Sequence, residues 1–425
     1  MTPPSSPPLS IIIIGAGFAG LTAAIECHRK GLTNLVLFEK SPSLSPLGDI
    51  ISFGQNSSRI FTNWGNLPDL LSPIIHKADQ VHFHDSSGRF VTTQSFKEEH
   101  LAWGERINGH RGEIHSLVYS HALSLGIPIR LGVTVTKYFE TPSHAGVVTS
   151  SGEAHTADLV IAAEGIRSKA RTLILGEEDH PLPSGYAVFR SWFPTPPSFF
   201  SSPLTSHLVS RGDTHNAWIG TDVHFLAASI KNGKEISWVC THVDTSDISE
   251  SWQFPGSKPA ALSLLQNWDP VVKELVKATP EERLFDYKLV FRDPLPTFVS
   301  PEGRTILVGD AAHPFLPTSI QGASQAMEDG VVLAVCLDRI KGDGTKVKEA
   351  VRVWEGLRYE RVHRVQKTGV TTREQWHKAD WDVIWKEPEV LHLKREGWIL
   401  DFDSERDAEE RYERVREGLV KEGRL

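Results

Sequence analysis

The sequence predicts an α/β protein in which helices cover a parallel β-sheet, a mainly antiparallel β-sheet is inserted, and a helical tail follows. The first observation is a run of four isoleucines, Ile11–Ile14, that leads directly into a glycine-rich turn and a segment with helical spacing. Such a continuous apolar strand is typical of a parallel sheet covered on both faces. Second, residues 181–294 contain runs that alternate like antiparallel strands. Third, residues 371–425 are highly charged and are predicted to form helices that cover the main body.

The size and composition are those of a globular protein with a sizeable core. The chain has 425 residues, 40% hydrophobic and 23% charged, which suggests two or three domains. Its net charge of -8 gives no reason to expect a nucleic-acid partner, which would require a basic patch. The cysteines Cys27, Cys240 and Cys336 stand far apart, which argues against a disulfide framework and a zinc site. Since this pattern is consistent with a reducing compartment, we expect a cytoplasmic protein.

The N-terminal residues 1–10 are rich in Pro and Ser, and we expect them to be disordered. The apolar run 11–25 resembles the core of a signal peptide, but it lacks a preceding basic region and is interrupted by glycines. No run of 18 apolar residues occurs, so we expect neither a signal peptide nor a transmembrane helix.

The first motif is Gly15-x-Gly17-x-x-Gly20, which stands between a predicted strand and a predicted helix. In such a unit the first glycine permits a tight turn, the second lets the backbone approach a pyrophosphate, and the third lets the helix pack against the strand. Glu39 ends the next predicted strand, where a carboxylate accepts the ribose hydroxyls. This order of strand, glycines, helix, strand and acid predicts a Rossmann-like dinucleotide site for either NAD or FAD.

A second motif, GDAAHPFLPTSIQG, occupies residues 309–322, far along the chain. It follows an apolar predicted strand and precedes a predicted helix, which are again the usual parts of an anion or nucleotide cradle. We expect Asp310, at the strand tip, to accept a hydroxyl of a ribityl chain. The helix after Gly322 would direct its positive end toward a flavin pyrimidine. One extended FAD that spans both motifs explains why the chain carries two cradles.

A third motif follows the predicted strand in ADLVIAAEGIRSKAR, where Glu164-Gly165 is followed by Arg171. Together, the three motifs resemble those of the FAD-dependent aromatic hydroxylases, which are single-component flavoprotein monooxygenases, and especially the salicylate hydroxylase-like branch. The resemblance extends over roughly residues 11–361. Further matching pieces are His110–His115, Glu250–Trp252, Pro255-Gly256, Trp268–Pro270 and Arg292–Pro296.

The resemblance implies a para-hydroxybenzoate hydroxylase-like fold and a set of cofactor contacts. FAD would bind non-covalently, and NADPH or NADH would bind transiently as the cosubstrate. Asp310 would hold the ribityl chain, and Pro314 would lie near the flavin ring. The residues implied to bind the cofactor are Gly15, Gly17, Ala19, Gly20, Glu39, Lys40, Arg111, Glu164, Gly165, Arg171, Gly309, Asp310, Pro314, Gln321, Gly322 and Ala323.

The sequence departs from the family pattern in three places. Glu164-Gly165 replaces the usual Asp-Gly and is one methylene longer. Ile320 stands where the family often has the first glycine of Gly-Gln-Gly, which removes a flexible position near the flavin and adds an apolar wall. Gly330 follows Glu328 and Asp329 where Ala is common. Because Gly costs about 1 kcal/mol against Ala inside a helix, we expect close packing at Gly330.

No nucleophile motif is present, which agrees with chemistry that is carried by a flavin. The candidates for a catalytic role are Arg59, Arg190, His313 and Pro314. Arg190 either lines the pocket or points outward from a strand, and His313 is expected to be structural rather than a base. A metal site is not expected, because the only pair with ligand spacing, His82 and His84, has no further ligand in the pattern.

We expect a discontinuous FAD-binding domain that is formed by residues 11–75, 100–180 and 295–370. A β-sheet substrate domain would comprise residues 76–99 and 181–294, with the pocket between the two domains, where such sites usually form. Residues 371–425 form the tail, for which a dimer contact or a lid are the alternatives to a simple cover.

The implied activity is hydroxylation of a phenolic or aromatic-acid substrate, and a role in secondary metabolism fits it. By resemblance, NAD(P)H reduces FAD, dioxygen adds to give a flavin C4a-hydroperoxide, and its distal oxygen attacks an electron-rich ring. The expected partners are a small aromatic substrate and dioxygen, and the chain is a monomer or a homodimer. The alternatives are epoxidation or another oxygen transfer to a non-aromatic substrate, a flavin oxidase or dehydrogenase, and a non-catalytic FAD-binding protein.

Overall fold

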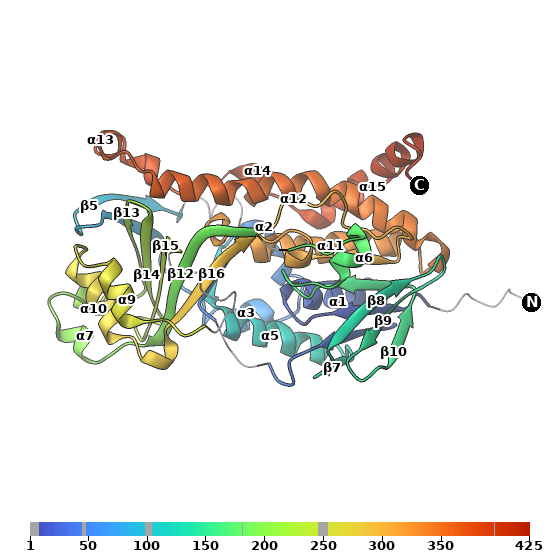
Figure 1. The fold of residues 1–425 in the computed structure, drawn as a ribbon, viewed down its shortest axis with the longest axis horizontal. Helices are drawn as coiled ribbons and strands as arrows, with labels where there is room; N and C mark the ends of the chain where they lie inside the picture. Colours follow the sequence, from blue (N-terminus) through green and yellow to red (C-terminus); the bar gives the residue numbers. More distant parts are fainter. Residues whose placement is uncertain (1–7, 45–47, 98–103, 181, 245–253, 395) are drawn as a thin grey trace, which may run out of the picture.

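The computed structural model describes residues 8–44, 48–97, 104–180, 182–244, 254–394 and 396–425. It has the predicted α/β fold, with a five-stranded parallel sheet toward one end of the molecule and a seven-stranded sheet at the other (Figure 1). Leu9 is buried, and the backbone N–H of Ser10 donates to Asp158 Oδ2 at 2.8 Å, so the ordered chain begins before Ile11. Residues 1–7 of the segment expected to be disordered lie outside the described residues, as do Glu250–Trp252.

The parallel sheet is built around the isoleucine strand. β1 (Ile11–Ile14) is buried along its whole length and pairs in parallel with β2 (Leu35–Glu39) and with β11 (Leu159–Ala162). β7 (Ile129–Leu131) and β17 (Thr305–Leu307) complete the strand order β17-β11-β1-β2-β7.

This strand order brings the three motifs to one edge of the sheet. The glycine-rich turn follows β1, Glu164 follows β11 and Gly309 follows β17. β11 is the direct neighbour of both other strands, and parallel strands have their carboxyl ends at the same edge. That edge is where ligands bind in open α/β sheets.

The seven-stranded sheet is mainly antiparallel, as predicted, with the order β16-β12-β15-β14-β13-β4-β5 and one parallel pair between β13 and β4. Trp218 and Trp238 are buried in its core. Its strands are β4 (Gln80–Asp85), β5 (Phe90–Ser95), β12 (Leu182–Pro194), β13 (Thr214–Gly220), β14 (Val223–Ile230), β15 (Glu235–Val243) and β16 (Phe285–Phe291). The smaller sheets are β8 (Val135–Glu140), β9 (Ala145–Thr149) and β10 (Ala154–Ala157), and the pair β3 (Ile50–Phe53) and β6 (Ile107–His110).

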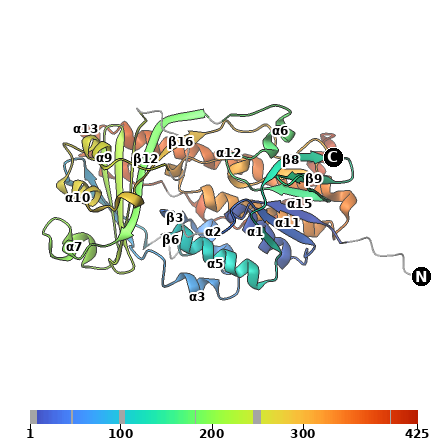
Figure 2. The ribbon, with the colours of Figure 1, turned by 60° about the horizontal axis from the view of Figure 1, so that its bottom comes forward.

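The helices cover the faces of both large sheets (Figures 1 and 2). Those before the tail are α1 (Phe18–Arg29), α2 (Gln55–Phe61), α3 (Leu67–Leu71), α5 (Arg111–Ser124), α6 (Ala170–Leu175), α7 (Ser198–Ser201), α8 (Ser206–Val209), α9 (Lys258–Leu264), α10 (Pro270–Ala278), α11 (Gly322–Arg339) and α12 (Val347–His377). The 3-10 turns are η1 (Glu281–Arg283), η2 (Gly309–Ala311), η3 (Pro317–Ser319), η4 (Gly344–Lys346) and η5 (Pro388–Leu391).

Two helices fix the arrangement around the site. α11 packs directly on α1, because a Cβ placed on Gly330 would lie 2.7 Å from the backbone nitrogen of Ala23. The close packing expected at Gly330 is therefore present. α12 is 31 residues long and runs from the parallel sheet to the seven-stranded sheet (Figure 1), where Nε2 of His377 lies 2.7 Å from Nδ1 of His224 on β14.

The tail folds back over both halves of the molecule. Its helices are α13 (Trp381–Ile384), α14 (Gly397–Leu400) and α15 (Ser404–Lys421). Leu393 exchanges two hydrogen bonds with the Gln94 side chain on β5, and Glu405 of α15 pairs with Arg29 and Lys30 at 2.6 Å each. Within the part of the chain that the structure describes, no helix combines the length and apolar character needed to cross a membrane.

Candidate functional site

The glycine-rich turn after β1 is tightly packed at two of its glycines and open at the third. Gly15 has a φ of +104°, and a Cβ there would lie 2.4 Å from the carbonyl oxygen of Ala163. A Cβ on Gly20 would lie 2.0 Å from the carbonyl oxygen of Gly15, so both positions require glycine. Gly17 is exposed at the N-terminus of α1, and a Cβ there would meet nothing within 4 Å. The backbone at Gly17 therefore faces open space that a ligand can enter.

The carboxylate of Glu39 lies beside this turn. One oxygen accepts the backbone N–H of Ala16 at 2.8 Å, and the other accepts the N–H of Ser41 at 2.8 Å. Glu39 is half-buried and the neighbouring Lys40 is exposed. The acid that the sequence places at the end of the second strand thus contacts the glycine-rich turn itself.

The second motif meets the first one directly. A Cβ on Gly309 would lie 2.8 Å from Cβ of Ala19, so the loop after β17 packs against the first turn of α1. Asp310 is next in the chain, and its side chain is exposed. The surrounding protein nevertheless displaces much of the bulk water around it, and this desolvation raises its pKa despite the nearby charges of His313 and Arg111. No group among the described residues donates a hydrogen bond to this carboxylate.

The third motif joins the same loop through Arg171. The guanidinium of Arg171 donates to the carbonyl oxygen of Ala311 at 2.8 Å and pairs with Asp179, which also pairs with Arg292 at 2.7 Å. Glu164 accepts a hydrogen bond from Ser168 at 2.7 Å, and burial raises its pKa. Gly165 has a φ of +81° and open space around its Cα. Arg171 is therefore buried as a support for the loop that carries Asp310.

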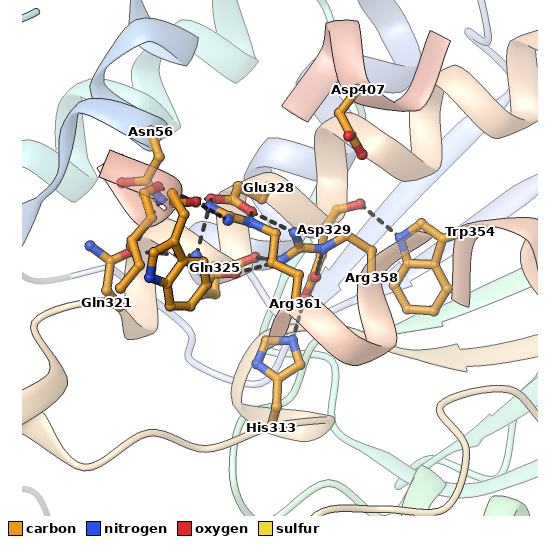
Figure 3. A network of polar contacts seen from close by, with 12 residues as sticks. Asn56, His313, Gln321, Gln325, Glu328, Asp329, Trp354, Arg358, Arg361 and Asp407 are labelled. Atoms are coloured by element: carbon orange, nitrogen blue, oxygen red, sulfur yellow. Dashed lines mark hydrogen bonds and ion pairs between the residues drawn. The ribbon is translucent and has the colours of Figure 1, made fainter. Parts of the chain in front are cut away.

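A buried carboxylate on α11 clamps the second motif from behind (Figure 3). Asp329 Oδ2 accepts the N–H of Gly309 at 2.9 Å and contacts His313 Nε2 at 2.6 Å, while Oδ1 accepts Arg358 Nε at 2.8 Å. Burial alone would raise the pKa of Asp329, but the charges of His313 and Arg358 outweigh it, so this pKa lies below its usual value. Asp329 is 0% exposed, and so acts as a structural anchor.

The neighbouring Glu328 extends this cluster toward α2 and the tail (Figure 3). Its oxygens accept Arg361 Nε at 2.8 Å, Arg361 Nη2 at 2.9 Å and Asn56 Nδ2 at 2.6 Å. Asn56 also donates to Gln321 Oε1 at 3.1 Å, and Arg361 donates to the backbone oxygen of Ile399 at 2.9 Å. The cluster therefore connects the second motif, the start of α2 and the C-terminal segment.

The four catalytic candidates occupy different places. His313 is 2% exposed and is bound by Asp329, which favours the structural role expected for it. Pro314 is buried, and its carbonyl oxygen accepts Gln366 Nε2 at 2.8 Å. Arg59 turns toward the tail, where it lies 3.3 Å from Asp401.

Arg190 is buried on β12, so it does not point outward from the strand, and it is not among the lining residues of the pocket described below. It is 7% exposed, and its Nη1 lies 3.2 Å from Asp49 Oδ2 in the segment before β3. The pair joins the seven-stranded sheet to the strand pair that leads into α2. Sequence reasoning left out Asp49, because nothing in its local pattern distinguishes it from an ordinary loop aspartate.

A pocket opens beside this cluster, with about 850 Å³ of empty volume that includes its mouth. We call it the tail-walled pocket. Its lining residues are Ser52, Gly54, Arg106, Thr318, Ser319, Ile320, Gln321, Thr368, Thr371, Thr372, Gln375, Leu393, Lys394, Glu396, Ile399 and Leu400. None of these residues belongs to the strands of the seven-stranded sheet. Its other lining residues come from α12 (Thr368, Thr371, Thr372 and Gln375) and from the tail (Leu393, Lys394, Glu396, Ile399 and Leu400).

Comparisons with known proteins agree with this geometry. A family described as an FAD binding domain matches residues 10–46. Asperlicin C monooxygenase of Petromyces alliaceus is 35% identical over 424 residues, which cover 97% of this chain and 90% of that protein. Notoamide E oxidase of Aspergillus sp. (strain MF297-2) is 34% identical over 424 residues, which cover 97% and 91%. The crystal structure of CtdE in complex with FAD and substrate 4 has a TM-score of 0.89 at 34% identity and covers 97% of this chain and 100% of that one.

The chain belongs to the FAD-dependent monooxygenases. A salicylate hydroxylase substrate complex with a TM-score of 0.79 and 23% identity shares the fold. The cofactor of this monooxygenase is therefore FAD, and two local features fit that group. The open backbone at Gly17 leaves room for a pyrophosphate at a helix N-terminus. The carboxylate of Asp310 lacks a donor among the described residues and can accept a hydroxyl.

Burial raises the pKa of the thiols Cys27, Cys240 and Cys336, so none of them is an activated thiolate. Sequence reasoning did not single out the residues that α12 and the tail contribute to the pocket, which are Thr368, Thr371, Thr372, Gln375, Leu393, Lys394, Glu396, Ile399 and Leu400. Neither segment carries a motif, and the hydroxyl, charged and amide side chains of residues 368–375 are typical of a solvated helix face. The only available signal was the apolar trio Trp398-Ile399-Leu400, which follows a charged stretch.

Proposed function

We propose that this monooxygenase uses NADPH or NADH to reduce FAD and hydroxylates a phenolic or aromatic-acid substrate in the tail-walled pocket, as a step of secondary metabolism. The observation that carries the proposal is the position of that pocket. Its lining includes Gly54 and Gln321, and a Cβ on Gly54 would lie 2.9 Å from Gln321 Nε2. Gln321 belongs to the same loop as Asp310, so the pocket adjoins the segment that we expect at the flavin.

The chain's own residues bind and orient in this proposal. The backbone at Gly17 and the N-terminus of α1 hold the pyrophosphate, Glu39 holds the ribose, and Asp310 accepts a ribityl hydroxyl. Residues 11–75, 100–180 and 295–370 would form the FAD domain, and 76–99 with 181–294 the second domain. When bound, FAD supplies electron transfer and the activation of dioxygen. The aliphatic side chains of Ile320 and Leu400 exclude water from the pocket.

The pocket's lining suits a ring that carries hydroxyl groups. Most of its polar side chains are neutral hydroxyls and amides, such as those of Ser52, Thr372 and Gln375. Arg106 is the buried charge of the lining, and its guanidinium lies 3.9 Å from the centre of the Phe96 ring. A phenol can exchange hydrogen bonds with such a wall, and Arg106 is placed to attract a carboxylate.

The test is oxygen incorporation under labelled dioxygen. The purified protein is supplied with NADPH or NADH and with salicylate, resorcinol, asperlicin C or notoamide E, the last two because relatives are named for them. The expected result is faster nicotinamide oxidation and a product that carries one labelled oxygen by mass spectrometry. As a matched control, the Gly17→Val variant should show neither, because its side chain fills the open space beside the turn.

The result also separates the alternatives. A labelled product that has lost its aromatic ring would support epoxidation or another oxygen transfer. A dehydrogenated product without label, accompanied by hydrogen peroxide, would contradict monooxygenation and support an oxidase, the word in one relative's name. Folded protein that binds FAD but consumes no nicotinamide with any compound would support a binding protein.

A further inference from the structure

Ile320 has a backbone conformation that isoleucine rarely adopts. Its φ is +56° and its ψ is +22°, in the left-handed region. Among the described residues, the other non-glycine residues with a positive φ are Asp222, Lys231, Asn232 and Lys341. All four are polar and unbranched at Cβ. A β-branched residue in this region is a true outlier, because its Cβ substituents crowd the following carbonyl.

The surrounding contacts hold this conformation in place. Thr318 Oγ1 donates to the carbonyl oxygen of Gly369 on α12 at 2.6 Å, and a Cβ on Gly369 would lie 3.2 Å from the backbone nitrogen of Ser319. The loop therefore lies close against α12. On the other side of Ile320, the Gln321 side chain accepts hydrogen bonds from Asn56 at 3.1 Å and Gln325 at 3.3 Å. Backbone strain persists in a folded protein only where neighbours fix it in this way, and it is concentrated at functional sites.

The side chain of Ile320 lines the tail-walled pocket, next to Gln321 and together with Ile399 and Leu400 of the tail. Glycine would adopt the same backbone conformation without strain. Isoleucine at this position therefore keeps an unfavourable conformation and, in return, places a branched aliphatic group in the pocket wall. Packing of the protein core does not account for this choice, because Ile320 is only half-buried.

We propose that Ile320 is a specificity-determining residue, because its strained backbone fixes its branched side chain as a rigid part of the pocket wall. This wall admits a flat ring. It excludes a ring that carries a bulky, branched substituent at the edge that enters beside Gln321. This inference rests on the proposed function only in taking the tail-walled pocket as the substrate site. The selected class is an unbranched, flat, electron-rich aromatic ring.

The test compares Ile320→Gly and Ile320→Ala with the parent. The probes are resorcinol and 4-tert-butylresorcinol, and their dissociation constants are measured from the change in absorption of bound FAD. In both variants we expect the preference for resorcinol over the branched probe to fall by about tenfold or more, the usual effect of opening an apolar wall. Ile320→Gly should also have a higher Tm than Ile320→Ala, the reverse of the order found at ordinary positions, because only glycine relieves the left-handed strain.

Lys341→Gly is the matched control. Lys341 also has a positive φ, 49°, but it is exposed and does not line the pocket. This variant should not lower the Tm and should leave the probe preference unchanged. The proposal would be overturned if Ile320→Gly and Ile320→Ala kept the probe preference of the parent. It would also be overturned if neither probe bound to the parent or to any variant. If the probe preference shifts but no labelled product forms with any substrate, the specificity role of Ile320 is supported and the proposed hydroxylation is contradicted.

Discussion

Replacing Asp329 by Asn should both destabilise the fold and release FAD. In the parent, the carboxylates of Glu328 and Asp329 pair with Arg358 and Arg361, and Asp329 also contacts His313. Removing one charge leaves an excess positive charge at side chains that are 1% and 0% exposed. Asn also cannot replace the hydrogen bonds. If its oxygen faces Gly309 and His313, its NH2 group faces the Arg358 donor, and the opposite orientation places NH2 against the N–H of Gly309.

Breaking a buried ion pair of this kind costs about 3–5 kcal/mol. Urea unfolding followed by tryptophan fluorescence measures the loss, and the ratio of flavin to protein absorption after gel filtration measures FAD retention. The control is Asp407→Asn on α15, which removes an ion pair with Arg411 at 2.9 Å near the surface and should cost no more than about 1 kcal/mol. If the two variants lose the same stability and keep the same FAD content, Asp329 does not anchor the second motif.

Three further outcomes are expected. Gly17→Val should lose FAD while the apoprotein keeps its Tm, whereas Gly20→Ala should lower the Tm because its Cβ would collide with the Gly15 carbonyl. Scanning fluorimetry with and without FAD distinguishes the two variants. Equal Tm losses would contradict the assignment of Gly17 to ligand binding and of Gly20 to packing. Because desolvation raises the pKa of Asp310 in the folded state, its ionisation costs stability once the pH rises above about 4. The apo form of Asp310→Asn should therefore be more stable than the apo parent at pH 7, and the difference in their free energies of unfolding should shrink toward pH 4. The FAD affinity of the variant should fall. A stability difference that stays constant with pH would rule out this ionisation as its cause. Arg190→Lys should keep FAD but lose turnover, because lysine cannot reproduce the guanidinium contact to Asp49. Steady-state rates at unchanged flavin content test this prediction. Full activity would remove Arg190 from the catalytic candidates.

The cofactor side of this protein was predictable because its signals are local. The positions of Gly15, Gly17 and Gly20 after an apolar strand define the turn, and the close contact of Gly330 with α1 follows from the cost of glycine within a helix. The family resemblance then placed Asp310 and Arg171 in the same region. Parallel pairing of β1, β11 and β17 turned three separate stretches into one edge.

The proposed substrate side was not predictable, because it depends on contacts between distant residues. Asp49 meets Arg190 across the middle of the chain, and nothing in either local pattern specifies the other. The contribution of α12 and the tail to the tail-walled pocket also depends on distant contacts, such as the hydrogen bond from Arg361 to the backbone of Ile399. The left-handed conformation of Ile320 could not be foreseen either, since β-branched residues disfavour it.

The length of α12 limits how this enzyme can open. Arg358 anchors the helix in the buried cluster near the parallel sheet, and His377 anchors it against β14 of the other sheet. A clamshell rotation of the two halves about a hinge would have to break the interior hydrogen bonds of α12 or detach one of these ends (Figure 1). If the tail-walled pocket is the substrate site, substrate and product should therefore enter and leave where Leu393, Lys394 and residues 396–400 separate from the body, and this movement would set the rate of entry.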